Sequence, residues 1–151
     1  MPDVNLYDVE ASADQDDPDG YHASYVRVGP LIGATALGAT VYDLPPGQSV
    51  CPYHYEHPTE EWLFVLAGRP SLRHPEGEDE LDPGDVVCFL EGPEGAHKVT
   101  NRTEEPVRIA ILSTKPSVDV VFYPDSDKIA VSPPGKIFRA GDAVDYWTGE
   151  V

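Results

Sequence analysis

Cysteine is scarce in this sequence, and long hydrophobic runs are missing altogether. The two cysteines, Cys51 and Cys88, are too few for a disulfide framework and are typical of a reduced intracellular protein. No apolar stretch approaches the length of about 18 residues that a transmembrane helix needs. The first residues also lack the basic and apolar regions of a signal peptide. We therefore expect a soluble, cytoplasmic protein that has no membrane partner.

Basic residues are the second shortage. Ten lysines and arginines stand against 27 aspartates and glutamates, which gives a formal net charge of -17. Such a surface repels nucleic-acid phosphates and anionic membranes. The sequence therefore argues against a nucleic-acid partner, and we expect the acidic surface to serve mainly solubility.

Helical periodicity is the third feature that the sequence lacks. Sixteen prolines and thirteen glycines are spread along the chain, and this spacing disfavours long helices. Between them lie short runs rich in β-branched and aromatic residues, such as YHASYVRV, ATALGATVYDL, EWLFVLAG and VRIAILST. Short strands at regular spacing predict an all-β sandwich or barrel, and 151 residues suit one domain.

Three regions are expected along this single domain. Residues 1–20 are too polar to bury and are read as an N-terminal arm. Residues 21–125 contain the strands of the barrel, and residues 126–151 form a C-terminal extension with a short helical turn. We expect this extension to pack on the barrel or on a partner protomer, because edge strands favour pairing into a homodimer.

Histidine and acidic residues gather in two segments, CPYHYEHPTEEWLFVLAG and GDVVCFLEGPEGAHKVTN, which hold three of the five histidines. Alternate side chains of a strand share a face, so His54 and Glu56 are expected to point the same way. A turn after His57 would return Glu61 beside them, and His97 on a later strand could complete the group. Imidazole and carboxylate groups are ligands for zinc, iron, nickel and manganese.

The two segments resemble the two motifs of the cupin family, G-x5-H-x-H-x3,4-E-x6-G and G-x5-P-x-G-x2-H-x3-N. The positions that carry the resemblance are His54, Glu61, Gly68, Gly84, Pro93, Gly95, His97 and Asn101. The resemblance implies a double-stranded β-helix, a jelly-roll barrel of the RmlC-like type. It also implies one divalent metal ion (iron, manganese, zinc or nickel) between His54, Glu61 and His97.

The sequence departs from the first motif at the second histidine, because Glu56 stands two residues after His54 and a histidine follows only at His57. One register gives the ligand set His54, Glu56, Glu61 and His97. The other makes His57 the second ligand and puts Tyr55 in the place of the first. Strand alternation favours Glu56, although a bulge could let His54 and His57 bind together.

Three functions are compatible with this pattern. The first is a metal-assisted enzyme, such as an oxygenase, that acts on an unidentified small molecule. The second is a non-catalytic module that binds a metal or a small molecule. The third is a metal-independent sugar isomerase or epimerase with a histidine base, which the family also contains. A separate alternative is that these side chains are ordinary polar residues of the barrel interior, as in cupins that have lost the metal and kept the pocket. Burying several unpaired carboxylates and imidazoles is costly, which favours a metal.

Four other residues carry structural expectations. Trp62 lies in a run that looks buried on both faces, so we expect it in the core. Asn101 is expected to tie down a turn and not to touch substrate. Cys51, three residues before His54, is expected near the rim of the pocket, and Cys88 is expected to be a small core residue.

Overall fold

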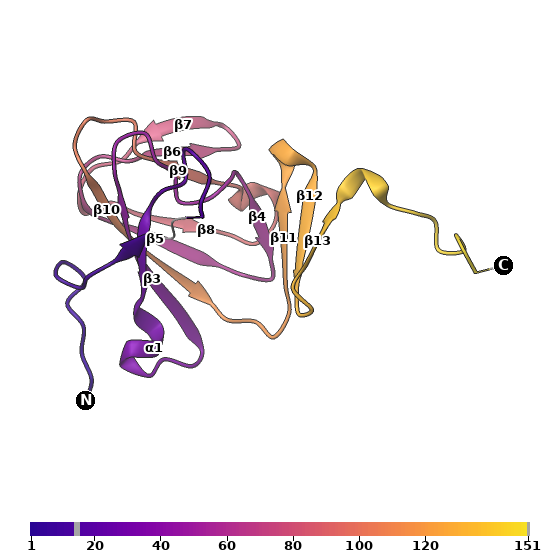
Figure 1. Cartoon of the computed structure of the whole chain (residues 1–151), viewed down its shortest axis with the longest axis horizontal. Coiled ribbons are helices and arrows are strands. Elements are labelled where there is room, and N and C mark those ends of the chain that lie inside the picture. The colour runs from indigo at the N-terminus through magenta and orange to yellow at the C-terminus, as the bar shows by residue number, and fades with distance from the viewer. Residues whose placement is uncertain (14–15, 151) are drawn as a thin grey trace.

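The computed structural model describes residues 1–13 and 16–150 (Figure 1). Residues 14–15 of the expected N-terminal arm and residue 151 of the expected C-terminal extension lie outside the described residues. Short antiparallel strands dominate the described residues, whose one α-helix, α1, covers only Val28–Ile32. The all-β prediction is confirmed.

The described strands form three antiparallel sheets. The six-stranded sheet has the order β1 (Ser12–Ala13), β2 (Ser24–Arg27), β3 (Leu37–Leu44), β10 (Val107–Thr114), β5 (Glu61–Ala67), β8 (Val86–Phe89). The three-stranded sheet has the order β7 (Gly77–Glu80), β6 (Ser71–His74), β9 (Lys98–Thr100). The four-stranded sheet has the order β13 (Lys136–Arg139), β12 (Lys128–Ser132), β11 (Asp119–Tyr123), β4 (Tyr55–His57). Short 3-10 turns follow at η1 (Pro93–Gly95), η2 (Pro124–Ser126) and η3 (Ala140–Asp142), the last being the expected C-terminal helical turn.

The core lies on the inner face of the six-stranded sheet. On β10 the inward positions repeat with period two, at Val107, Ile109 and Ile111, as strand alternation requires. They pack against Leu63 of β5 and Leu44 of β3, both of which have no exposed surface. The remaining buried members of this cluster are Ala23, Leu72, Phe89 and Val99.

Trp62 lies on the outer face of β5 and not in the core. Leu63 and Val65 are buried, but Trp62 is 45% exposed, so the prediction that it belongs to the core is wrong. Trp62 points to the face of the sheet opposite the core, where it lies across from Leu112 of β10. The apolar run EWLFVLAG is continuous in sequence because both faces carry large side chains, although only one of them is fully covered. Cys88 was likewise expected in the core and is exposed.

The N-terminal residues lie along part of this outer face. Val4, Leu6 and Val9 pack against a second apolar cluster that includes Val41. Arg108 of β10 donates hydrogen bonds to the backbone carbonyls of Leu6 at 2.9 Å and Val9 at 2.6 Å. The first residues of the chain are therefore fastened to the sheet.

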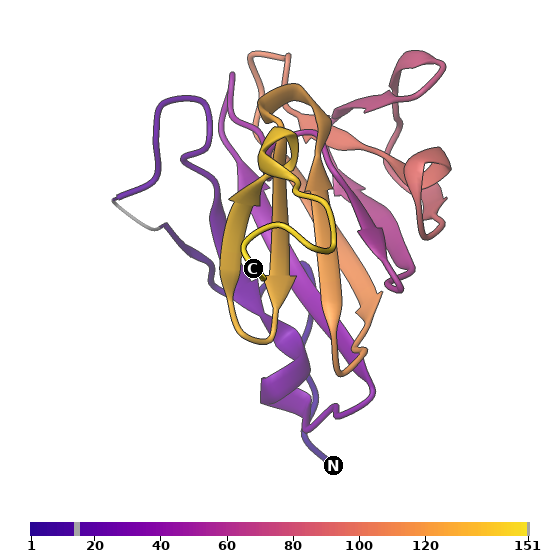
Figure 2. The same ribbon diagram turned by 90° about the vertical axis from the view of Figure 1, so that its right-hand side faces the viewer.

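The C-terminal hairpin β12–β13 extends the four-stranded sheet outward from β11, and the chain then runs away from the body (Figures 1 and 2). Several large apolar side chains of this part are exposed: Ile137, Phe138, Val144, Tyr146 and Trp147. In the described part of the chain, no helix is both long and apolar enough to cross a membrane.

Candidate metal centre

Two histidines from distant parts of the chain face each other across a short antiparallel bridge. The amide of His54 donates to the carbonyl of His97 at 3.1 Å, and the amide of His97 donates to the carbonyl of His54 at 2.8 Å. This bridge brings the two ring centres to 4.5 Å. Glu61, the first residue of β5, reaches the same place from the six-stranded sheet.

These three side chains converge on one point. His54, Glu61 and His97 each offer a ligand atom, and the three atoms lie within 4.8 Å of one another. His54 and His97 are buried, and the Glu61 side chain is only 15% exposed. Nε2 of His97 lies 3.5 Å from a carboxylate oxygen of Glu61. The group could therefore hold a metal ion.

The backbone fixes how the two rings present their nitrogens. Nδ1 of His54 lies 3.0 Å from the carbonyl oxygen of Pro52, and Nδ1 of His97 lies 2.9 Å from that of Gly95. A carbonyl oxygen only accepts, so each Nδ1 is the donor and each neutral ring keeps its lone pair on Nε2. Such backbone partners orient histidine ligands in metal sites. Phe89 stacks on His97 at 3.6 Å between ring centres and so covers one face of that ring.

Burial decides the charges of this group. Desolvation, with the adjacent His54, lowers the pKa of His97 to about 3, and desolvation also lowers the pKa of His54. Burial raises the pKa of Glu61 to about 8, and the carboxyls of Glu56 and Asp119 add to the rise. The histidines are thus neutral, and the carboxylate lacks a counter-charge. Two neutral imidazoles and one carboxylate fit a borderline divalent cation, which would supply that charge.

Glu56 lies beside this group on the same side of β4. Its carboxylate is 3.8 Å from Nε2 of His54, and its side chain is 17% exposed. Burial raises its pKa to about 7, and the nearby Asp119 carboxyl contributes to the rise. Glu56 is therefore a partly exposed acidic group within reach of the centre.

His57 points to the opposite face of β4. Its side chain is 46% exposed and lies 3.8 Å from a carboxylate oxygen of Glu91. Its ring meets Tyr55 and Phe122 edge to face. The structure therefore brings Glu56 to the side of His54, Glu61 and His97, and it does not bring His57 there.

Three residues near the centre were not predicted from the sequence. Asp119 accepts a hydrogen bond from Thr59 Oγ1 at 3.1 Å, and Tyr123 stacks on His54 with ring centres 6.0 Å apart. Tyr42 of β3 has its pKa raised to about 12, first by burial and then by the neighbouring Cys51 and Glu61. The only signal for Asp119 and Tyr123 was their period-two spacing on the strand VDVVFYP, which nothing in the sequence linked to His54.

Cys51 and Asn101 also have defined surroundings. Sγ of Cys51 lies 3.5 Å from Nδ1 of His54, and burial raises the pKa of its thiol to about 12. Asn101 is fully buried, and its side chain bonds to the backbone carbonyls of Leu44 and Glu105 and to Thr103. Its expected role in a turn is confirmed.

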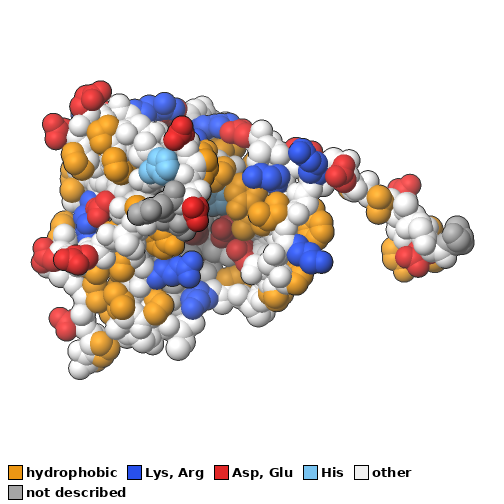
Figure 3. Space-filling view, in the orientation of Figure 1, with side chains coloured by type: hydrophobic (Ala, Val, Ile, Leu, Met, Phe, Trp, Pro, Cys, Tyr) orange, Lys and Arg blue, Asp and Glu red, His pale blue; other side chains and the backbone are white. Residues whose placement is uncertain are grey.

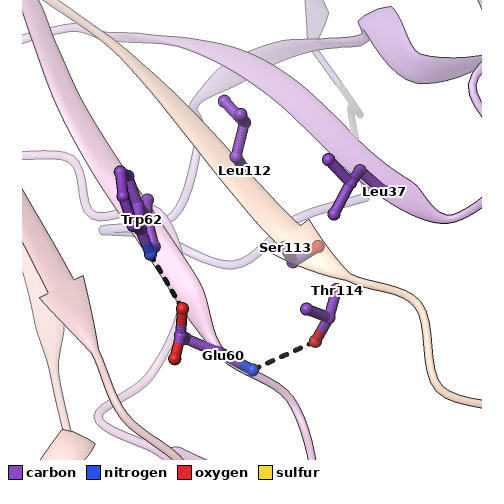
Figure 4. A pocket seen from close by; sticks show the side chains of 6 residues that line it. All are labelled: Leu37, Glu60, Trp62, Leu112, Ser113 and Thr114. Atoms are coloured by element: carbon purple, nitrogen blue, oxygen red, sulfur yellow. Dashed lines mark hydrogen bonds between the residues drawn. The ribbon is translucent and has the colours of Figure 1, made fainter.

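A separate apolar pocket of about 290 Å³ lies on the outer face of the six-stranded sheet (Figure 4). It is lined by Leu37, Glu60, Trp62, Leu112, Ser113 and Thr114. Glu60 accepts a hydrogen bond from the Trp62 indole at 3.0 Å. Trp62 alternates with Glu61 along β5, so this pocket opens on the other face of the strand from the metal ligands.

The fold and the centre together define a family. The cupin domain model matches residues 40–114, which contain every residue of the His54, Glu61 and His97 group. The chain belongs to the cupin superfamily, as its two motifs indicated. No curated protein matches the sequence.

Solved structures share the fold over most of the chain. A sugar phosphate isomerase of the cupin superfamily from Silicibacter pomeroyi is 24% identical, with a TM-score of 0.82, covering 96% of this chain and 98% of its own. A putative sugar phosphate isomerase from Acidithiobacillus ferrooxidans is 22% identical, with a TM-score of 0.83, covering 93% of this chain and 91% of its own. The polyketide cyclase RemF from Streptomyces resistomycificus is 23% identical, with a TM-score of 0.62, covering 76% of this chain and 79% of its own. At these identities the likeness shows the fold alone.

Proposed function

We propose that this protein is a metal-assisted enzyme that acts on a small organic molecule. The observation that carries the proposal is the convergence of ligand atoms of His54, His97 and Glu61, with both rings held by backbone carbonyls. The ion is iron, manganese, zinc or nickel, which accept this mixed nitrogen and oxygen set.

The bound ion would supply Lewis-acid polarisation of a substrate oxygen. The chain supplies the rest of the site. Glu56 stands next to the ligand group and would move a proton to or from the substrate as a general base or acid. Asp119, held by Thr59, adds negative charge that favours the protonated form of Glu56. Tyr123, stacked on His54, covers one side of the centre.

This arrangement favours a metal-assisted reaction, with Glu56 as the proton-transfer group, over a metal-free reaction with a histidine base. A histidine base works best when its pKa is near the working pH, and burial holds the pKa of His97 far below that range. A metal-free isomerase with a histidine base is therefore supported less well than a metal-assisted reaction. The isomerases and the cyclase with the same fold are consistent with substrates rich in oxygen functions.

Metal analysis of the purified protein tests the ligand group. We expect about one divalent ion per chain after reloading, and loss of that ion in Glu61→Gln. Glu60→Gln is the matched control, because Glu60 is adjacent but lies in the outer pocket. Equal metal content in the two variants would contradict the proposed ligand set.

Turnover by the loaded protein tests the enzyme. The panel contains aldose and ketose phosphates, hydroxy acids and, under oxygen, phenolic substrates. We expect at least one substrate to be consumed by the loaded protein and not after treatment with a chelator. A fully loaded protein that binds members of the panel and consumes none would instead support the non-catalytic binding module.

We also propose that the protein is a homodimer. Support comes from the exposed apolar side chains of the C-terminal hairpin and tail, where Phe138 is 51% and Trp147 is 72% exposed. Patches of this kind are usually covered by a partner. Light scattering checks the mass, and a monodisperse monomer at micromolar concentration would contradict the dimer.

A further inference from the structure

One face of the four-stranded sheet borders the candidate metal centre. Residues paired across neighbouring strands point to the same face, and so do residues two apart on one strand. Glu56 pairs with Val121, and Val121 is two residues before Tyr123. Since Tyr123 stacks on His54, this is the face that looks toward the metal ligands.

The same register places two cations on that face. Tyr123 pairs with Lys128 of β12, and Lys128 pairs with Arg139 of β13. The ammonium of Lys128 lies 5.2 Å from the centre of the Tyr123 ring, a cation–π distance. Lys128 is thus one aromatic ring away from His54, at a separation that a small molecule can span.

Like charges directly across an antiparallel pair are destabilising, and this pair is not neutralised. Within residues 1–13 and 16–150, no carboxylate oxygen lies within 4.0 Å of Lys128 or Arg139. Acidic residues are not in short supply, since the chain has 27 of them. Arg69, Arg73, Arg102 and Arg108 each form an ion pair, and the other lysines and arginines of the described residues do not.

The surroundings make this positive charge unusual. Figure 3 shows lysine and arginine side chains at the edge of a hollow in which acidic side chains lie deeper. An anionic ligand is repelled by the acidic surface and by Glu56 and Asp119 at the centre. It can approach only where local cations outweigh that field. Lys128 offers a point charge, and Arg139 offers a forked donor suited to phosphate oxygens.

We infer that Lys128 and Arg139 bind an anionic group of the substrate, a phosphate in preference to a carboxylate, while the other end of the molecule reaches the metal centre. Two adjacent cations match a dianion better than a monoanion. The inference names the substrate class for the proposed enzyme and rests on that function for its second half. Binding of the anion itself depends only on the two cations.

The test is a calorimetric titration of metal-loaded protein with inorganic phosphate at low ionic strength, which measures the Kd for phosphate. We expect Lys128→Gln to raise the Kd for phosphate about tenfold, the loss expected for one charge-assisted contact. Lys136→Gln is the matched control. Lys136 lies on β13 and pairs with Val131, three residues from Arg139. Strand alternation therefore turns its side chain away from Lys128, and we expect Lys136→Gln to change the Kd for phosphate by less than about twofold.

Three further variants and probes complete the experiment. Arg139→Gln is expected to weaken phosphate binding, and Lys128→Arg is expected to keep it. Acetate is expected to bind more weakly than phosphate. The melting temperature of Lys128→Gln should change little, because the lost cation–π contact with Tyr123 offsets the relief of the like-charge repulsion across the strand pair. Should that variant fail to fold, Arg139→Gln gives the same test.

The outcomes separate this inference from the proposed function. Equal effects of Lys128→Gln and Lys136→Gln, or no effect of either, would overturn the anion site and leave the metal centre untouched. Phosphate binding that depends on Lys128 in a protein that takes up no metal would support the anion site and refute the metal-assisted enzyme. Acetate binding as tightly as phosphate would refute the phosphate preference.

Discussion

Replacing Asn101 with alanine should destabilise the fold without altering the metal centre. The Asn101 side chain is fully buried. Its amide nitrogen donates to the carbonyls of Leu44 and Glu105, both at 2.8 Å. Its oxygen accepts from the amide of Thr103 at 2.9 Å and from the Thr103 hydroxyl at 2.7 Å. One side chain therefore ties the end of β3 to the loop that leads into β10.

The magnitude follows from which partners would be left without a hydrogen bond. A buried polar group that loses its partner costs about 1–3 kcal/mol. Leu44 is completely buried, so its carbonyl cannot turn to water and carries the full cost. Glu105 and Thr103 lie at the surface of the loop and recover part of theirs. We expect a loss of about 3 kcal/mol, a large share of the 5–15 kcal/mol typical of a domain.

Urea unfolding followed by fluorescence measures this loss, with metal content recorded for the same samples. Arg102→Ala is the control at the neighbouring position, because Arg102 pairs with Glu78 at the surface and should cost less than about 1 kcal/mol. The reasoning is refuted if Asn101→Ala unfolds at the wild-type urea midpoint. A normal midpoint with reduced metal content would place Asn101 in the functional site instead.

Other substitutions test the backbone, the N-terminal arm and the choice of ligand. Gly68 has φ +74°, and an added Cβ would lie 2.6 Å from a backbone oxygen. Gly68→Ala should therefore lower the melting temperature more than Gly47→Ala, which has φ +78° but open space; equal losses would show that only the dihedral angle matters. Arg108→Met removes the bonds to two arm carbonyls and should speed limited proteolysis of the arm, so an unchanged cleavage rate would argue against this anchor. His57→Gln should leave metal content and turnover unchanged, whereas Glu56→Gln should keep the metal and reduce turnover at least about a hundredfold, the lower end of the usual range for a general base. The reverse ranking would favour His57 as the ligand.

The strands could be predicted because their signals are local. Turn residues mark the ends of the runs, and alternation correctly placed Glu56 on the side of His54 and His57 on the other. Trp62 was placed wrongly because a strand with apolar residues on both faces does not reveal which face another layer covers. Its exposure of 45% is set by the arrangement of the sheets and not by its neighbours in sequence.

The surroundings of the metal centre could be predicted only in part, for a related reason. The two motifs contain all three of His54, Glu61 and His97, and the isolated bridge between His54 and His97 joins one motif to the other. Asp119 and Tyr123 come from β11, whose pairing with β4 joins segments more than sixty positions apart. Neither segment contains a sequence signal for that pairing. The position of Asp119 and Tyr123 beside the centre is therefore known only from the structure.

The two ends of the proposed site differ in the sign of their charge. At one end, neutral imidazoles and carboxyls with raised pKa values require positive charge, which a divalent ion would bring. At the other end, Lys128 and Arg139 form an unneutralised positive pair, which an anionic group would satisfy. One molecule can occupy both parts of this face if an oxygen function at one end reaches the metal centre and an anionic group at the other end reaches Lys128 and Arg139. A neutral analogue that lacks the anionic end would reach only the metal centre, so it should bind the loaded protein more weakly and in either orientation.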